Sequence, residues 1–344
     1  AVAVAVVMSY VWTKPGPLAM KLLQEDLERI NAIGEFDLVD FRIVPGAGGN
    51  VLRIVIKDRA WGRTSARFGI NLAADFKGNS GFELVTSITR TSLNRLGGEW
   101  RVVAGVGELT TINGELFQPL ASGSPFFAAG LVSWSTDTPE IAVGDAARVD
   151  VRRKGYSWSG DVGVGDGKFV ELRAGARLGH LWADPASADV LPDESVDRGA
   201  VVARLTVDSR DNVPFPRSGV GLRVRMDWQT PALGADVSSR RLEGIGVGAF
   251  SFGKNTLQLA AMGGSPVKTT LPYYDWFGLG GFRRLSGYGL DELWGPYMAF
   301  GSVTYMREIG RFKSSIIGGG MYLGGSLEAG NTWQDGAKVS LSDL

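Results

Sequence analysis

The chain has 344 residues, with 36 Lys and Arg, 36 Asp and Glu, one His and no Cys. A chain without cysteine has no disulfide, thiolate metal site or cysteine nucleophile, and a single histidine, His180, rules out a multi-histidine zinc site. Zero net charge argues against electrostatic binding to nucleic acid. We therefore predict no metal, no cofactor and no nucleic-acid partner.

Residues 1–61 predict a small α+β unit. Apolar residues recur at helical spacing over 18–33, with charged residues between them. Two strands are predicted at 36–44 and 51–56, separated by a Pro-Gly-Ala-Gly-Gly-Asn turn. The alternating Ala and Val at 2–7 suggest a further short strand.

From residue 62 onward the sequence predicts β-strands and no helix. Period-two alternation of apolar and polar residues recurs at 148–152, 169–182, 201–208 and 219–228, separated by turn-forming residues. In the last of these segments one face is apolar, and it consists of Val220, Leu222, Val224, Met226 and Trp228. The other face is Gly221, Arg223, Arg225 and Asp227. Each such strand therefore has two chemically different faces.

Two architectures would bury one face of so many strands. In a soluble sandwich or barrel the apolar face points inward, whereas in an outer-membrane barrel it points to lipid and the polar face lines the lumen. Segments of about 10 residues are long enough to cross a bilayer when tilted. Aromatic residues lie near the segment ends, as interfacial girdles require: Trp100, Trp134, Trp182, Trp228, Tyr297 and Trp333. We predict the membrane barrel, with a soluble β-rich binding protein or enzyme as the alternative.

Three sequence motifs occur in the order found in one family of outer-membrane proteins. Gly278-Leu-Gly-Gly-Phe-Arg-Arg-Leu-Ser-Gly-Tyr288 resembles the loop-six motif of the outer-membrane insertase and two-partner-secretion superfamily. The segment from Asp208-Ser-Arg-Asp211 to Phe215-Pro-Arg-Ser-Gly219 is similar to its mid-barrel signature. Ser326-Leu-Glu-Ala-Gly-Asn-Thr-Trp333 resembles its late strand, with an inward-facing acid at Glu328. Residues 1–61 are similar to a POTRA repeat, the periplasmic unit of this superfamily.

The resemblance implies a mainly β protein, namely a transmembrane antiparallel β-barrel of a 16-stranded family at 62–344, preceded by the POTRA-like module at 1–61. The family continues for about three strands beyond the point where this sequence stops. We therefore expect a C-terminally truncated barrel that lacks its closing strands, because an open edge in lipid leaves backbone groups unpaired.

The resemblance also implies a set of site residues. In the loop-six motif they are Arg283, Arg284, Leu285, Ser286, Gly287 and Tyr288. In the mid-barrel signature they are Asp208, Arg210, Asp211, Pro216 and Gly219. The superfamily's loop arginine falls at Ser286, so this chain departs from the pattern there. The resulting hypothesis is that the loop folds into the lumen and that Arg283 or Arg284 pairs with Glu328, with Tyr288 packed beside them.

The variants Leu-Ser-Gly-Tyr at 285–288 and Glu at 328 resemble the barrel half of bacterial patatin-like phospholipases. That branch implies a Gram-negative outer-membrane anchor or translocator, related to type V secretion, with its module in the periplasm and a lipase passenger preceding residue 1. The chain itself contains no Gly-x-Ser-x-Gly motif, so no catalytic residues are predicted in it. The implied partners are outer-membrane lipids, the passenger and the outer-membrane assembly machinery, with a homo-oligomer left open. The alternative is a general insertase or a two-partner-secretion transporter.

Overall fold

The computed structural model describes residues 4–32, 36–58, 63–74, 80–107, 109–143, 147–213, 215–313, 318–336 and 339–340. Residues up to Asp58 form a small α+β unit with helices α1 (Val4–Ser9) and α2 (Met20–Ala32) and the hairpin strands β1 (Phe36–Gly46) and β2 (Gly49–Asp58). No helix in these described ranges is long and apolar enough to cross a membrane.

The small unit packs its own apolar core. Val7, Ile30 and Phe36 are buried together, because the apolar stripe of α2 faces α1 and the hairpin. Residues 4–9 are helical, so the strand predicted at 2–7 is wrong there. Alternating Ala and Val leave no polar face, so the apolar pattern does not distinguish strand from helix.

A buried carboxylate ties the start of the chain to α2. Asp26 is fully buried and accepts hydrogen bonds from the backbone N–H groups of Trp12 and Thr13, at 3.0 and 2.8 Å, and from Arg29. Burial by itself raises the pKa of Asp26, but the hydroxyl of Thr13, which also donates to it, and these donors outweigh burial and hold the pKa below its usual range.

The rest of the described chain is a large antiparallel sheet. Its strands are β3 (Thr64–Ala74), β4 (Ser80–Arg90), β5 (Glu99–Gly107), β6 (Thr110–Pro119), β7 (Phe126–Asp137), β8 (Glu140–Val143), β9 (Ala147–Gly165), β10 (Val170–Pro185), β11 (Glu194–Asp208), β12 (Gly219–Gln229), β13 (Ser239–Phe252), β14 (Asn255–Pro266), β17 (Tyr297–Lys313) and β18 (Gly318–Trp333). The sheet order runs β18-β17-β14-β13-β12-β11-β10-β9-β7-β6-β5-β4-β3, and β8 pairs with β9.

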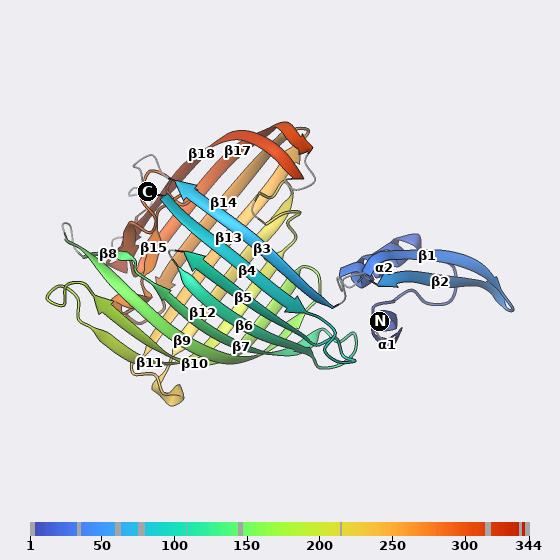
Figure 1. Ribbon diagram of the computed structural model, residues 1–344, viewed down its shortest axis with the longest axis horizontal. Coiled ribbons are helices and arrows are strands. Elements are labelled where there is room, and N and C mark those ends of the chain that lie inside the picture. Colours follow the sequence, from blue (N-terminus) through green and yellow to red (C-terminus); the bar gives the residue numbers. More distant parts are fainter. Residues whose placement is uncertain are drawn as a thin grey trace.

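The sheet curves into a barrel, and the small unit lies beyond the end at which β3 begins (Figure 1). We call this the near end and the opposite one the far end. Because consecutive strands are antiparallel, the β9–β10, β11–β12 and β13–β14 turns lie at the near end. Lys168 of the β9–β10 turn accordingly forms an ion pair with Glu28 of α2, with a distance of 2.7 Å between Nζ and Oε2.

The two faces of the strands follow the alternation predicted from the sequence. On β12 the apolar side chains Val220 and Trp228 are 51% and 43% exposed on the outside, whereas Asp227 is only 5% exposed on the inside. The same holds on β10, where Leu172 and Leu178 are exposed and the intervening arginines point inward. A band of exposed apolar side chains outside and a polar inner wall are the arrangement of a barrel that faces lipid.

A cluster of aromatic side chains lies at the far-end edge of this band. Tyr156 and Trp182 flank His180, whose ring lies 4.3 Å from that of Trp182, measured between centroids. His180 bonds to Asp197 through Nδ1 at 2.6 Å and to Ser195 through Nε2 at 3.0 Å. His180 therefore lies toward the far end of β10, among aromatic and polar neighbours.

Candidate functional site

The longest connection described in the barrel, residues 267–296 between β14 and β17, folds into its interior. We call it the lumenal loop. It contains one 3₁₀ turn, η2 (Tyr273–Asp275), and a small hairpin of β15 (Phe277–Leu279) and β16 (Leu293–Gly295). Phe277, Leu279 and Leu285 of the loop are buried against Met298 and Phe300, which lie on the inner face of β17. These inward-facing apolar residues explain why the loop packs here rather than in solvent.

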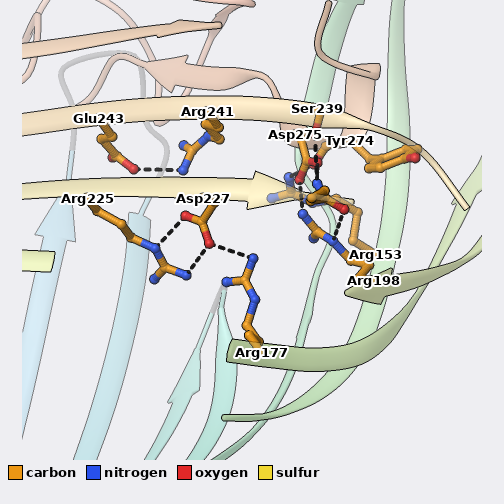
Figure 2. A network of polar contacts seen from close by, with 11 residues as sticks. Arg153, Arg177, Arg198, Arg225, Asp227, Ser239, Arg241, Glu243, Tyr274 and Asp275 are labelled. Carbon is orange, nitrogen blue, oxygen red and sulfur yellow. Dashed lines mark hydrogen bonds and ion pairs between the residues drawn. The ribbon is translucent and has the colours of Figure 1, made fainter. Parts of the chain in front are cut away.

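The base of the lumenal loop is fixed to the opposite wall by polar contacts (Figure 2). Asp275 is buried and accepts bonds from Arg198 of β11 at 2.5 Å and from Gln229 of β12 at 2.8 Å. Arg153 of β9 donates to the backbone carbonyl of Tyr274 at 3.2 Å. Because the same loop also packs on β17, it spans the lumen from one wall to the other.

Further ion pairs line the wall beside this attachment (Figure 2). Asp227 of β12 is bonded by Arg225, with distances of 2.6 and 3.0 Å, and by Arg177 of β10 at 2.7 Å. On β13, Arg241 pairs with Glu243 at 2.8 Å. These charge-assisted bonds hold the side chains in fixed positions, so this wall is a preorganised polar surface.

The tip of the lumenal loop, by which we mean residues 283–288, binds Glu328 of β18. The backbone N–H groups of Leu285 and Ser286 donate to Oε2 of Glu328 at 3.0 and 2.7 Å. The hydroxyl of Ser286 donates to both carboxylate oxygens, at 3.1 and 3.0 Å, and Ser326 donates to Oε1 at 2.6 Å. The tip therefore offers Glu328 a cluster of neutral donors.

The expected ion pair between Glu328 and Arg283 or Arg284 is not formed, so this part of the sequence hypothesis is wrong. Arg284 donates to the carbonyl of Gly278 at 2.7 Å and lies 3.4 Å from Asp291. The side chain of Tyr288 is 43% exposed. Ser286, which stands where the superfamily motif has an arginine, is the residue that contacts Glu328. It does so because the loop backbone turns its N–H groups toward β18.

Arg283 connects the tip to the mid-barrel signature instead. Its guanidinium donates to Oε1 of the buried Gln258 on β14, and Gln258 in turn donates to the carbonyl of Pro216 at 2.6 Å. The guanidinium also lies 5.8 Å from the ring centroid of Phe215. Two of the sequence motifs, at 208–219 and 278–288 and at least 59 residues apart along the chain, thus meet inside the barrel. The sequence did not predict a role for Gln258. The alternation of β14 indicates that its side chain faces inward, but it does not indicate which residues that side chain contacts.

The depth reached by the tip follows from the strand geometry. Pro266 ends β14 at the far end, where the lumenal loop begins, and Gln258 lies 266 − 258 = 8 residues back along that strand. At about 3.3 Å per residue this is roughly 26 Å of strand. The tip therefore reaches nearly to the near-end turns, and the loop occupies most of the length of the lumen along β14.

The mid-barrel signature forms the near-end turn between β11 and β12. Arg210 makes a two-pronged ion pair with Asp208, at 2.9 and 2.7 Å, and its side chain crosses Gly221. Asp211 accepts from the backbone N–H groups of Arg217 and Ser218 at 2.8 and 3.1 Å. Partial burial raises the pKa of Asp211, and these backbone donors more than offset it, so the pKa is lowered. The turn is held by its own carboxylates.

Comparison with known proteins agrees with this geometry. Residues 171–331 match the model of the Omp85 superfamily domain. A search of the curated proteins found no match. The structure is similar to BamA from Haemophilus ducreyi lacking POTRA domains 1–3, with a TM-score of 0.66 and 12% identity, covering 96% of this chain and 69% of that one. It is also similar to CdiB from Acinetobacter baumannii, with a TM-score of 0.55, 12% identity and coverage of 97% and 66%. For CdiB from Escherichia coli these values are 0.56, 12%, 95% and 68%.

Proposed function

We propose that this Omp85-superfamily barrel resides in the outer membrane of a Gram-negative bacterium and acts there as an anchor and translocator, with the small unit in the periplasm. The observation that carries the proposal is the pairing of an exposed apolar outer face with a polar inner wall crossed by the lumenal loop. The inner strands of the sheet pair on both sides, as lipid requires, and within the described residues no pairing joins the edge strands β3 and β18.

The finer proposal concerns the passenger. We propose that the chain serves a patatin-like lipase that precedes residue 1, and that the small unit holds this passenger near the barrel. The support is in the sequence: Leu-Ser-Gly-Tyr at 285–288 and Glu at 328 resemble the patatin-like branch. The contact between Ser286 and Glu328 gives these two variant positions a shared physical role, since a serine donor replaces an arginine donor.

A second candidate is a general insertase or a two-partner-secretion transporter. The fold similarity to BamA and to CdiB favours it. The two candidates differ in what precedes the barrel. A Gly-x-Ser-x-Gly domain encoded upstream of residue 1 supports the lipase anchor, whereas additional POTRA-like units without that domain support the insertase or transporter and overturn the lipase anchor.

The membrane assignment is tested by expressing the chain behind a secretion leader in a Gram-negative host. We expect the protein in the outer-membrane fraction, soluble only with detergent, and migrating differently on a gel before and after heating, because a folded barrel resists detergent. A monomeric, folded protein recovered without detergent would overturn the proposal, and it would favour the soluble β-rich alternative.

A further inference from the structure

We propose that the inner wall carries an oxyanion-binding strip centred on Arg204 of β11 and Arg223 of β12, which takes a doubly charged group such as phosphate. Strand register places the strip on the near-end side of the Arg225–Asp227 ion pair, because Arg204 is opposite Arg225 and Arg223 precedes Arg225 on β12. It is separate from the contacts that hold the lumenal loop, and it depends on the barrel fold alone.

Strand register places three arginines side by side. Arg173 of β10 is the direct partner of Arg204, and Arg204 is the direct partner of Arg225 on β12. All three alternate with outward apolar residues, so they face the lumen. Directly opposed residues have their Cβ atoms about 4.5–5.5 Å apart, and like charges in such pairs repel. A row of three guanidinium groups therefore needs negative charge nearby.

The two outer arginines of this row have that charge. Arg173 bonds to Glu171 at 2.6 and 3.0 Å and also to Glu115. Arg225 is bonded to Asp227. The central Arg204 makes no hydrogen bond or ion pair with any residue that the structure describes. The guanidinium in the middle of the row is thus not bonded directly by any described carboxylate.

A second guanidinium without a partner lies next to it. Arg223 is exposed to the lumen, opposite Thr206, and it too makes no hydrogen bond or ion pair within the described ranges. Arg204 and Arg223 are diagonal neighbours, whose separation of about 7–8 Å suits two long side chains that converge on one group. Guanidinium groups donate in forks that match the geometry of phosphate oxygens.

One carboxylate competes for this position. Asp161 of β9 lies over Gly175, whose missing side chain leaves room for it: a Cβ there would stand 2.3 Å from Oδ1 of Asp161. Asp161 is buried and is separated from β11 by the whole width of β10. It lowers the positive potential of the strip without bonding to Arg204. An incoming dianion would meet both guanidinium groups, with Asp161 near Arg204 and Asp208 near Arg223 as opposing charges.

The experiment is a calorimetric titration of inorganic phosphate into the full chain in a neutral detergent, at low ionic strength, because salt screens such contacts. We expect binding by the native protein, and a loss of about tenfold or more in affinity for Arg204→Gln and for Arg223→Gln, as removal of a charge-assisted bond implies. Arg204→Lys should fall between, since it keeps the charge and loses the fork. Arg101→Gln, an inward arginine on β5 paired with Glu99, should stay within about twofold.

Asp161→Asn provides the opposite change. We expect it to tighten phosphate binding, because it removes the competing charge. Heat-dependent gel migration checks that each variant is folded. Absence of binding by the native protein, equal affinity in Arg204→Gln, or weaker binding in Asp161→Asn would each overturn the proposal. Acetate is titrated in parallel; if it bound as tightly as phosphate, the strip would recognise carboxylates and the assignment to a doubly charged group would be wrong.

Discussion

At the scale of single residues, the most informative contact is that of Ser286 with Glu328. The sequence hypothesis, taken from the family resemblance, paired the half-buried Glu328 with Arg283 or Arg284, since a charge-assisted bond between arginine and a carboxylate is strong. The structure supplies two backbone N–H groups and a hydroxyl instead. Turning them toward β18 requires Arg283 and Leu285 at positive φ, 62° and 73°, which is uncommon for residues with a side chain.

This contact predicts the effect of three substitutions on heat stability in detergent. Ser286→Ala should lower the unfolding temperature, because the hydroxyl bond to a carboxylate contributes on the order of 1 kcal/mol. Glu328→Ala should lower it further, since it leaves all the tip donors without their acceptor. Arg95→Gln, at an exposed position outside the lumenal loop, is the control and should change it little. An effect of Glu328→Ala no larger than that of Ser286→Ala would contradict the role of the backbone donors.

At the scale of elements, the near-end turn between β11 and β12 depends on one glycine. Gly219 has φ of +95°, and a Cβ there would stand 2.2 Å from the carbonyl oxygen of Ser209. Only glycine adopts this conformation freely. The conformation of this turn sets the position of the Pro216 carbonyl, to which Gln258 donates. It therefore also affects the position of Gln258, which accepts the hydrogen bond from Arg283.

Gly219→Ala is therefore expected to destabilise the barrel by about 2 kcal/mol or more, from the left-handed backbone and the close carbonyl. Gly248→Ala on the neighbouring strand β13 is the control, because a Cβ there meets no atom within 4 Å. The measurement is the temperature at which the heat-resistant gel form is lost. Equal behaviour of the two variants would contradict the strain argument.

At the scale of the whole molecule, the outer face determines where the protein resides. Val224 lies near the middle of β12 and Val220 near its near-end terminus, and both belong to the outward apolar face. In a bilayer the cost of an arginine on this face depends on depth, at about 2–4 kcal/mol at the midplane and about 0–1 kcal/mol near the interface.

Val224→Arg should accordingly reduce folding into lipid vesicles much more than Val220→Arg does, as measured by denaturant titration of the folded barrel. A soluble protein would show no such dependence on depth. If both variants lost the same stability, the apolar face would not be in contact with lipid.

The sequence by itself determined the strands, their two faces and the small N-terminal unit, because period-two and period-3.6 patterns are local properties of the chain. The ends of β10 and β12 lie within three residues of the predicted segments, whereas β11 begins at Glu194, seven residues before the predicted start at 201. The partners of the motif residues were decided only by the tertiary structure. Arg283 reaches Gln258, and Ser286 reaches Glu328, because the loop's backbone angles and the strand register set which groups meet. Neither quantity is encoded in the spacing of residues along one strand.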